Sequence, residues 1–205
     1  MKKVRIAVLV SGGGTNLQAL IDAQGSVLRS GEITLVVSNA RGAYALERAK
    51  KAGIATETVI KKECGGQEGF ETKLMEILDD NGIEVIILAG FMTILTERFT
   101  SHYPKRILNV HPSLIPSFCG EGFYGLKVHA EALKYGVKVT GATVHFVNEI
   151  PTVERLLPRR PSVSKRAIPL RSCSAVLWSR PNGSCCPRLR KRSAPHYRNK
   201  WRIYQ

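Results

Sequence analysis

Residues 5–21 read RIAVLVSGGGTNLQALI. An apolar run is followed by a glycine-rich loop and then by a segment in which apolar residues recur as in a helix. The run Arg5-Ile6-Ala7-Val8-Leu9-Val10 is short and β-prone, so it predicts a buried strand. Ser11-Gly12-Gly13-Gly14-Thr15-Asn16 turns the chain, and Leu17-Gln18-Ala19-Leu20-Ile21 begins a helix. A buried strand that leads through glycines into a helix is typical of α/β proteins.

The same alternation continues outward from this unit to about residue 150. We expect further strands at residues 33–37, 56–60, 85–89, 107–110 and 140–147, and helices at 44–52, 70–80 and 128–135. The unbroken apolar run at 85–89 indicates a strand that is buried on both faces of a parallel sheet. The pattern predicts a doubly wound, mostly parallel α/β sheet, in which ligands bind beyond the carboxyl ends of the strands.

The composition changes near Pro151. Residues 151–205 contain 14 Lys and Arg but a single acidic residue, whereas residues 1–150 contain 17 basic and 15 acidic residues. The net charge of +15 therefore belongs mainly to the last quarter of the chain. We expect an α/β domain over 1–150 and an irregular, basic Pro/Arg-rich tail over 151–205, much of it disordered.

The remaining composition excludes several classes of protein. A chain of 205 residues suits one domain, and no apolar run is long enough to span a membrane. The N-terminus has no signal-peptide pattern, so a cytoplasmic protein without a membrane partner is expected. The five cysteines are odd in number and lack zinc-ligand spacing, which disfavours a disulfide framework and a structural zinc site.

The glycine-rich loop has the properties of a phosphate cradle, because backbone N–H groups and a positive helix end converge there. Asn16-Leu17 stands where a dinucleotide-binding fingerprint requires its last glycine, and no Gly-Lys-Ser/Thr follows. Dinucleotide binding is therefore disfavoured. Binding of a phosphomonoester and a tight glycine turn without a ligand both remain open.

Asn109-Val110-His111-Pro112-Ser113 places an amide and an imidazole two residues apart at a strand end, on one face. An Asn amide can donate to a developing oxyanion and a His can move a proton. Equally, Asn109 can cap a turn beside a partly buried His111. His145 suits a packed strand position, and His102, His129 and His196 show no partner pattern. The segment 89–95 is apolar and suits either the wall of a site for a flat ring or the core.

Four of these stretches together resemble the phosphoribosylglycinamide formyltransferase family. They are residues 11–19, 88–92, 109–116 and 141–147, in the family's order and spacing within residues 4 to about 151. The resemblance implies a Rossmann-like formyltransferase fold. It also implies formyl transfer from 10-formyltetrahydrofolate to the amine of glycinamide ribonucleotide in purine (IMP) biosynthesis, with no metal.

The resemblance also implies roles for individual residues. Asn109 would stabilise the tetrahedral oxyanion, His111 would act as general acid or proton shuttle, and His145 would support them. Thr93 stands where an arginine is common, and Gln67 where some members carry an arginine near the folate tail. The residues implied for the phosphate are Gly14, Thr15 and Asn16, and those for the folate are Met92, Thr93, Ile94 and Leu95 together with Asn109.

The resemblance stops after Pro151, where the family continues with Asp-Gly-Gly and this chain has Thr152-Val153-Glu154. The family's catalytic aspartate is therefore absent at Thr152. We propose a one-nucleotide frameshift before this codon. The other frame permits Asp-Gly-Gly there and, if Ser184 has an AGY codon, reads Cys185-Cys186 as Leu-Leu, which resembles the family's last helix. We expect impaired activity, and an unpaired edge on the strand at 140–147.

Two alternatives remain. The basic tail, with its cluster at residues 188–192, suits a nucleic-acid-binding α/β protein, although the position where the tail begins disfavours nucleic acid as the partner. A formyltetrahydrofolate hydrolase would use water as acceptor and would not need the phosphate loop. Monomer and homodimer are both compatible with the sequence.

Overall fold

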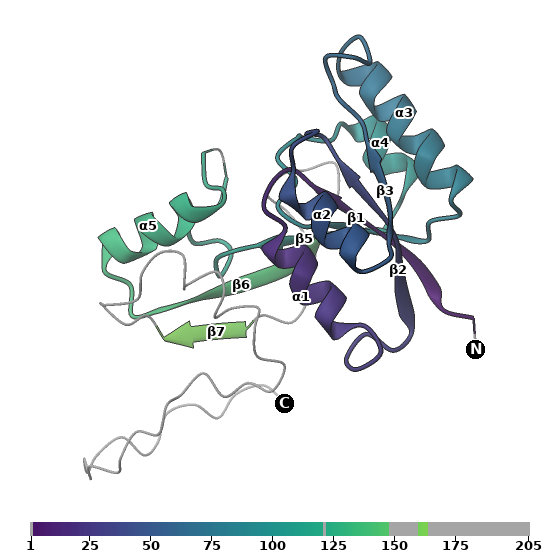
Figure 1. The fold of residues 1–205 in the computed structure, drawn as a ribbon. Helices are drawn as coiled ribbons and strands as arrows, with labels where there is room; N and C mark the ends of the chain where they lie inside the picture. The colour runs from purple at the N-terminus through teal and green to yellow at the C-terminus, as the bar shows by residue number, and fades with distance from the viewer. Residues whose placement is uncertain (1, 121, 148–159, 164–205) are drawn as a thin grey trace, which may run out of the picture.

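The computed structural model describes residues 2–120, 122–147 and 160–163. Thr152 and His196 lie outside these residues. The basic tail, which we expected to be largely disordered, also lies outside them except for residues 160–163. Figure 1 shows the described chain as one sheet with helices around it.

In the described residues, seven strands form a sheet in the order β3-β2-β1-β4-β5-β6-β7. The first five strands in this order are mutually parallel, and β6 and β7 are antiparallel additions next to β5. The predicted mostly parallel, doubly wound fold is therefore confirmed. The strands are β1 (Val4–Val10), β2 (Gly31–Ser38), β3 (Ala55–Thr58), β4 (Val85–Leu88), β5 (Ile107–His111), β6 (Val139–Phe146) and β7 (Arg160–Val163).

The helices begin and end close to the predicted positions, with one addition. They are α1 (Thr15–Ala23), α2 (Tyr44–Lys51), α3 (Gln67–Asp80), α4 (Glu97–His102) and α5 (Leu126–Tyr135). The sequence did not predict α4, because six residues span less than two turns and give no helical period. Phe99 nevertheless fixes this short helix to the core, where its side chain is fully buried.

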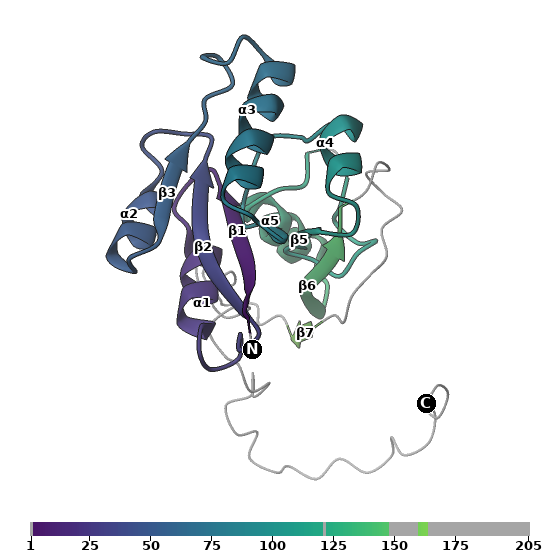
Figure 2. The same cartoon turned by 90° about the vertical axis from the view of Figure 1, so that its right-hand side faces the viewer.

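The helices cover both faces of the sheet, as Figure 2 shows for α1 and α2 against α3 and α4. Successive side chains of β1 point to opposite faces. Ala7 and Leu9 pack in a cluster with Phe70 and Phe99, and Val8 packs in a second cluster with α1 and α2. This two-sided burial explains why β1 and β4 are nearly continuous apolar runs.

The outer edge of β6 is partly covered. β7 pairs with residues 139–142 of β6, from Val139 opposite Val163 to Ala142 opposite Arg160. The prediction of an unpaired edge is therefore wrong for this half of the strand. A four-residue strand within a Pro- and Arg-rich segment gives no sequence signal, because it is too short for alternation to be recognised.

The surface of the domain carries charges of both signs. Arg41 and Glu63 form an ion pair at 2.6 Å, and the Glu63 carboxylate raises the pKa of Arg41.

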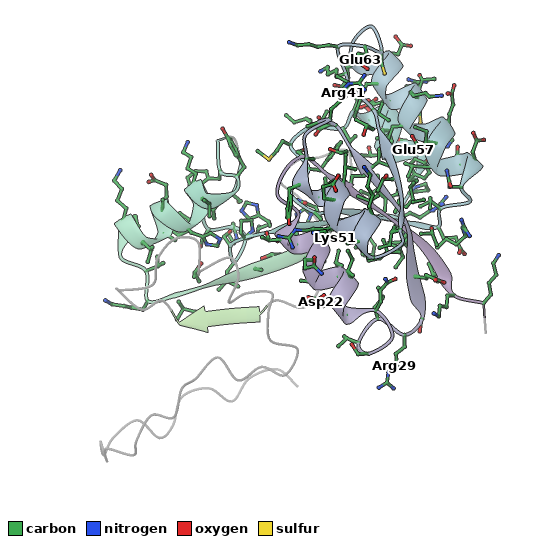
Figure 3. All side chains as sticks on the ribbon, in the orientation of Figure 1. Asp22, Arg29, Arg41, Lys51, Glu57 and Glu63 are labelled. Carbon is green, nitrogen blue, oxygen red and sulfur yellow. The ribbon has the colours of Figure 1, made fainter. Side chains whose placement is uncertain are left out.

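No helix in the described segments is both long and apolar enough to span a membrane. Figure 3 labels six exposed charged side chains: Asp22, Arg29, Arg41, Lys51, Glu57 and Glu63.

Candidate active site

The strand order brings three loops to one edge of the sheet. β1, β4 and β5 are adjacent and parallel, with Leu9 opposite Leu88 and Leu88 opposite Asn109. Neighbouring strands lie about 4.8 Å apart, so the backbones of Leu9 and Asn109 are separated by about 10 Å. The segments that follow these three strands therefore leave the sheet side by side, at its carboxyl edge.

The glycine-rich loop is supported by α2. Gly14 adopts φ 68° directly before α1, and a Cβ at this position would lie 2.6 Å from the Cβ of Ala45. Ala45 N–H donates to the Gly12 carbonyl at 3.0 Å, and Arg48 Nε donates to the Gly13 carbonyl at 2.9 Å. These contacts fix the glycine-rich loop, which leads directly into α1. The N–H groups in the first turn of a helix lack intrahelical acceptors. Such an arrangement suits an anion.

The loop after β4 contacts the glycine-rich loop directly. Met92 N–H donates to Ser11 Oγ at 2.8 Å, and Asn39 Nδ2 donates to Thr93 Oγ1 at 2.7 Å. Met92 and Ile94 remain 52% and 85% exposed although their side chains are large and apolar. Exposed apolar side chains next to an anion-binding loop suit a ligand that has a flat ring and a polar end.

Asn109 and His145 meet across β5 and β6. The Asn109 Nδ2 atom lies 3.1 Å from His145 Nε2, and His145 Nδ1 lies 3.3 Å from the Phe146 carbonyl. Because a carbonyl only accepts, the proton of the neutral ring belongs on Nδ1, and Nε2 accepts from the Asn109 amide. His145 is 3% exposed. It therefore orients the Asn109 carboxamide with its NH₂ group toward β6.

His111 is oriented by the loop that follows β5. Its Nε2 donates to the Phe118 carbonyl at 2.8 Å, and Phe118 itself adopts φ 51°. The Phe118 ring contacts the rings of Phe123 and Tyr135 with centroids 6.2 and 6.0 Å apart. The protonated nitrogen of His111 is thereby fixed by a backbone group, which sets the direction of the ring.

His129 is a buried neighbour that the sequence did not single out. Burial, and then the charge of His111, lower the pKa of His129, and its buried Nδ1 has no hydrogen-bond partner in the described residues. Both effects favour the neutral ring at pH 7. Its place on α5 gave no signal, because its burial and its electrostatic interaction with His111 depend on how α5 packs.

The structure brings together most of the residues predicted from sequence. Gly14, Thr15 and Asn16 stand at the start of α1, and the segment 92–95 lies beside their loop. Asn109 contacts His145, whereas His111 is directed to the Phe118 carbonyl. Sequence reasoning named His145 as a supporting residue. It missed Phe118, whose backbone carbonyl holds His111, and Ala45 and Arg48, which hold the glycine-rich loop from α2. In the described ranges, no three His, Cys, Asp or Glu side chains gather as metal ligands.

Comparison with known proteins gives a consistent result. The family model described as formyl transferase matches residues 4–150. Phosphoribosylglycinamide formyltransferase of Escherichia coli is 43% identical over 71% of this chain, and the match covers 66% of that protein. The chicken trifunctional purine biosynthetic protein adenosine-3 is 45% identical over 72% of this chain and 14% of its own length. The chain thus spans less than two thirds of these relatives.

A solved structure shows the same fold. Phosphoribosylglycinamide formyltransferase from Brucella melitensis superposes with a TM-score of 0.78 at 34% identity. The superposition covers 87% of this chain and 89% of that protein. At this identity and coverage the likeness extends to the sequence as well as to the order of helices and strands.

Proposed function

Since the chain belongs to the phosphoribosylglycinamide formyltransferase family, we propose that it acts on that family's substrates. The reaction is transfer of the formyl group of 10-formyltetrahydrofolate to the amine of glycinamide ribonucleotide, a step of purine biosynthesis. The hydrogen bond between Asn109 and His145, at the same sheet edge as the glycine-rich loop, is the observation that carries this proposal. It supplies an oriented amide donor where a phosphorylated substrate would bind.

The chain offers a separate group for each part of the substrates. The loop with Gly14, Thr15 and Asn16 would bind the phosphate through backbone N–H groups. The segment 92–95 would bind the pterin ring through its backbone and the exposed side chains of Met92 and Ile94. This division agrees with the hydrogen bond from Met92 N–H to Ser11, which keeps the two subsites adjacent.

The chemical step uses the β5 residues. The substrate amine attacks the formyl carbon, and the carbonyl oxygen becomes a tetrahedral oxyanion that accepts a hydrogen bond from the Asn109 amide. Collapse breaks the bond between the formyl carbon and the folate nitrogen. His111 assists by moving the proton from the attacking amine to the leaving nitrogen. His145 acts only through Asn109, by fixing the rotation of its carboxamide.

We also infer that turnover is impaired. The family's carboxylate partner for the histidine would stand at Thr152, and a threonine carries no negative charge to favour the cationic imidazole. General acid–base groups contribute about 10²–10⁴ in rate. Insertion of one nucleotide before codon 152 should therefore raise turnover by about this factor. Turnover by the present chain that matches the frame-restored chain would contradict the inference.

Calorimetric titration tests the proposed substrates without requiring turnover. Both glycinamide ribonucleotide and the stable analogue 10-formyl-5,8-dideazafolate should bind the chain as it stands. Release of formate from 10-formyltetrahydrofolate without any ribonucleotide would instead indicate the hydrolase. Salt-dependent RNA binding that is lost on deletion of residues 151–205, without binding of either small molecule, would favour the nucleic-acid alternative.

A further inference from the structure

Glu71 is a buried carboxylate on the core side of α3. Its side chain is only 1% exposed, and the same helix contributes Phe70 and Leu74 to the apolar cluster beneath it. Transfer of a carboxylate into such surroundings is strongly unfavourable unless hydrogen bonds compensate. The hydrogen bonds that Glu71 accepts should therefore explain why a carboxylate is buried there.

In the described residues, the Glu71 carboxylate accepts hydrogen bonds from Thr96, in the segment that follows β4, and from Gln67 on its own helix. Oε1 accepts from the Thr96 backbone N–H at 2.7 Å and from Gln67 Nε2 at 2.6 Å, and Oε2 accepts from Thr96 Oγ1 at 2.5 Å. No cation pairs with the carboxylate in the part of the chain that the structure describes. Three neutral donors therefore hold it, and two of them belong to Thr96.

Gln67 extends the connection by two residues. The same Nε2 group that donates to Glu71 also donates to the Ile94 carbonyl at 3.0 Å. Residues 94 and 96 are thus both tied to α3. The other end of the segment is tied by Met92 N–H to Ser11 and by Thr93 to Asn39. The backbone from 92 to 96 is held at both ends while its apolar side chains at Met92 and Ile94 face solvent.

We propose that Glu71 is a positioning residue for the segment 92–95, which fixes the backbone that receives the pterin ring. This inference rests on the proposed function, because it assigns the folate to that segment. A backbone fixed before binding loses less conformational freedom when the ligand binds, so affinity rises without a new contact. Glu71 touches no substrate and acts through Gln67 and Thr96.

The alternative is that Glu71 merely attaches α3 to α4, which begins one residue after Thr96. The two roles differ in what a substitution changes. Loss of a structural attachment lowers stability and weakens both substrates together. Loss of positioning weakens folate binding while ribonucleotide binding stays the same, since the glycine-rich loop is supported by α2 through Ala45 and Arg48.

The test uses the full chain with two pairs of variants. Glu71→Ala removes both acceptor oxygens and with them all three hydrogen bonds, whereas Glu71→Gln keeps one oxygen for the Thr96 and Gln67 N–H groups. Thr96→Val removes only the hydroxyl, and Thr96→Ser restores it. Glu68→Gln is the matched control, because its carboxylate is exposed on the same helix. The readouts are amide exchange in residues 91–96 and calorimetric Kd values for 10-formyl-5,8-dideazafolate and for glycinamide ribonucleotide.

We expect Glu71→Ala to weaken folate binding by about 10-fold to 10²-fold, because the segment must then be ordered when the ligand binds. Exchange in residues 91–96 should rise, and the ribonucleotide Kd should stay the same. Glu71→Gln and Thr96→Ser should recover most of the loss, and Thr96→Val should give a smaller loss than Glu71→Ala. If Glu71→Ala does not fold, Thr96→Val carries the test.

Three outcomes would overturn the inference. Folate binding that is equal in all variants would reject the positioning role alone. Equal weakening of both ligands would assign Glu71 to the attachment of α4. No folate binding by the unaltered chain would reject the proposed function, and the inference with it.

Discussion

The two parts of the sheet bury different kinds of side chain. β1, β2, β4 and the start of β5 pack against α1–α4 through two apolar clusters. After Ile107, the buried hydrophobic side chains in the described residues are only Val128 and Ala132. The buried polar side chains of this later part are Ser113, His129, Thr140, Thr143 and His145.

The apolar part of the molecule mainly stabilises the fold, whereas the polar part after Ile107 orients side chains for the proposed chemistry. In the later part, Thr143 Oγ1 donates to the Ser113 carbonyl at 2.7 Å and accepts from Ile115 N–H at 3.1 Å. Hydrogen bonds fix directions in such a network, whereas apolar burial supplies most of the stability. The proposed binding loops belong to the apolar part, and Asn109 lies on the boundary. Binding and turnover should therefore be separable by mutation.

Asn109→Ala should give the largest effect and should lower turnover far more than it weakens ligand binding. Loss of one oxyanion donor costs about 10²–10³ in kcat. Steady-state kinetics on the frame-restored chain provide the measurement, and titrations of both ligands provide the control. Because Gly14 does not depend on Asn109, the ribonucleotide Kd should stay the same. The folate Kd should change far less than kcat, since the segment 92–95 remains in place. A parallel loss of ligand binding would show that the two parts are not independent.

Gly14→Ala should act in the opposite way, on binding and stability. The new Cβ would lie 2.6 Å from the Ala45 Cβ at a φ of 68°, so the loop must move. Overpacking of this kind costs about 1–3 kcal/mol, and the phosphate donors should move with the loop. Gly12→Ala is the matched control, because nothing lies within 4 Å of its added Cβ. Urea unfolding and ribonucleotide titration should both distinguish the two variants; equal behaviour would reject the role of the Ala45 contact.

The sequence predicted the apolar part of the fold well because its signals are local. Apolar runs at 5–10 and 85–89 indicated buried strands, and the structure has β1 and β4 there. The family resemblance is also confirmed by the comparisons. The short elements α4 and β7 were not predicted, since six and four residues are too few to show a period.

The site was predictable in its residue types and not in its orientations. Asn109 and His111 stood out because their chemistry is specific, and their roles stay predictions. The partner of His111 is the Phe118 carbonyl, a backbone group that no side-chain pattern can indicate. Glu71 and Thr96 are 25 residues apart and meet only after α3 packs on the sheet. Orientation therefore came from tertiary packing.

Val8→Ala and Val128→Ala compare the two parts directly, because both side chains are fully buried. Each variant removes two carbons, worth about 1.6 kcal/mol of burial. A cavity adds to this cost at both positions. In β1 the lower β-propensity of alanine adds further to it. In α5 the higher helix propensity of alanine offsets about 0.5 kcal/mol of it. Urea unfolding should show a larger loss in the free energy of unfolding for Val8→Ala than for Val128→Ala. The reverse order would contradict the proposed difference between the two parts.

Asp79→Asn should give the smallest effect and tests whether polar contacts stabilise the apolar part. Asp79 accepts from Tyr103 Oη at 2.8 Å and lies 2.9 Å from His102 Nε2. Burial raises the pKa of Asp79, but hydrogen bonds from His102 and Tyr103 outweigh it, so the pKa lies below its usual value. Burial, and then Asp79, raise the pKa of Tyr103.

A lowered carboxylate pKa stabilises the fold above the unfolded value of about 3.9 and loses this contribution as the pH falls through the folded pKa. Because the Asp79 side chain is 50% exposed, the contribution at pH 7 should stay below about 1 kcal/mol. Urea unfolding at pH 7 should therefore show a loss smaller than that of Val8→Ala, and the loss should shrink below pH 4. Glu76→Gln, an exposed position on the same helix, is the control. A loss equal to that of Val8→Ala would mean that polar contacts contribute as much as the apolar core in this part.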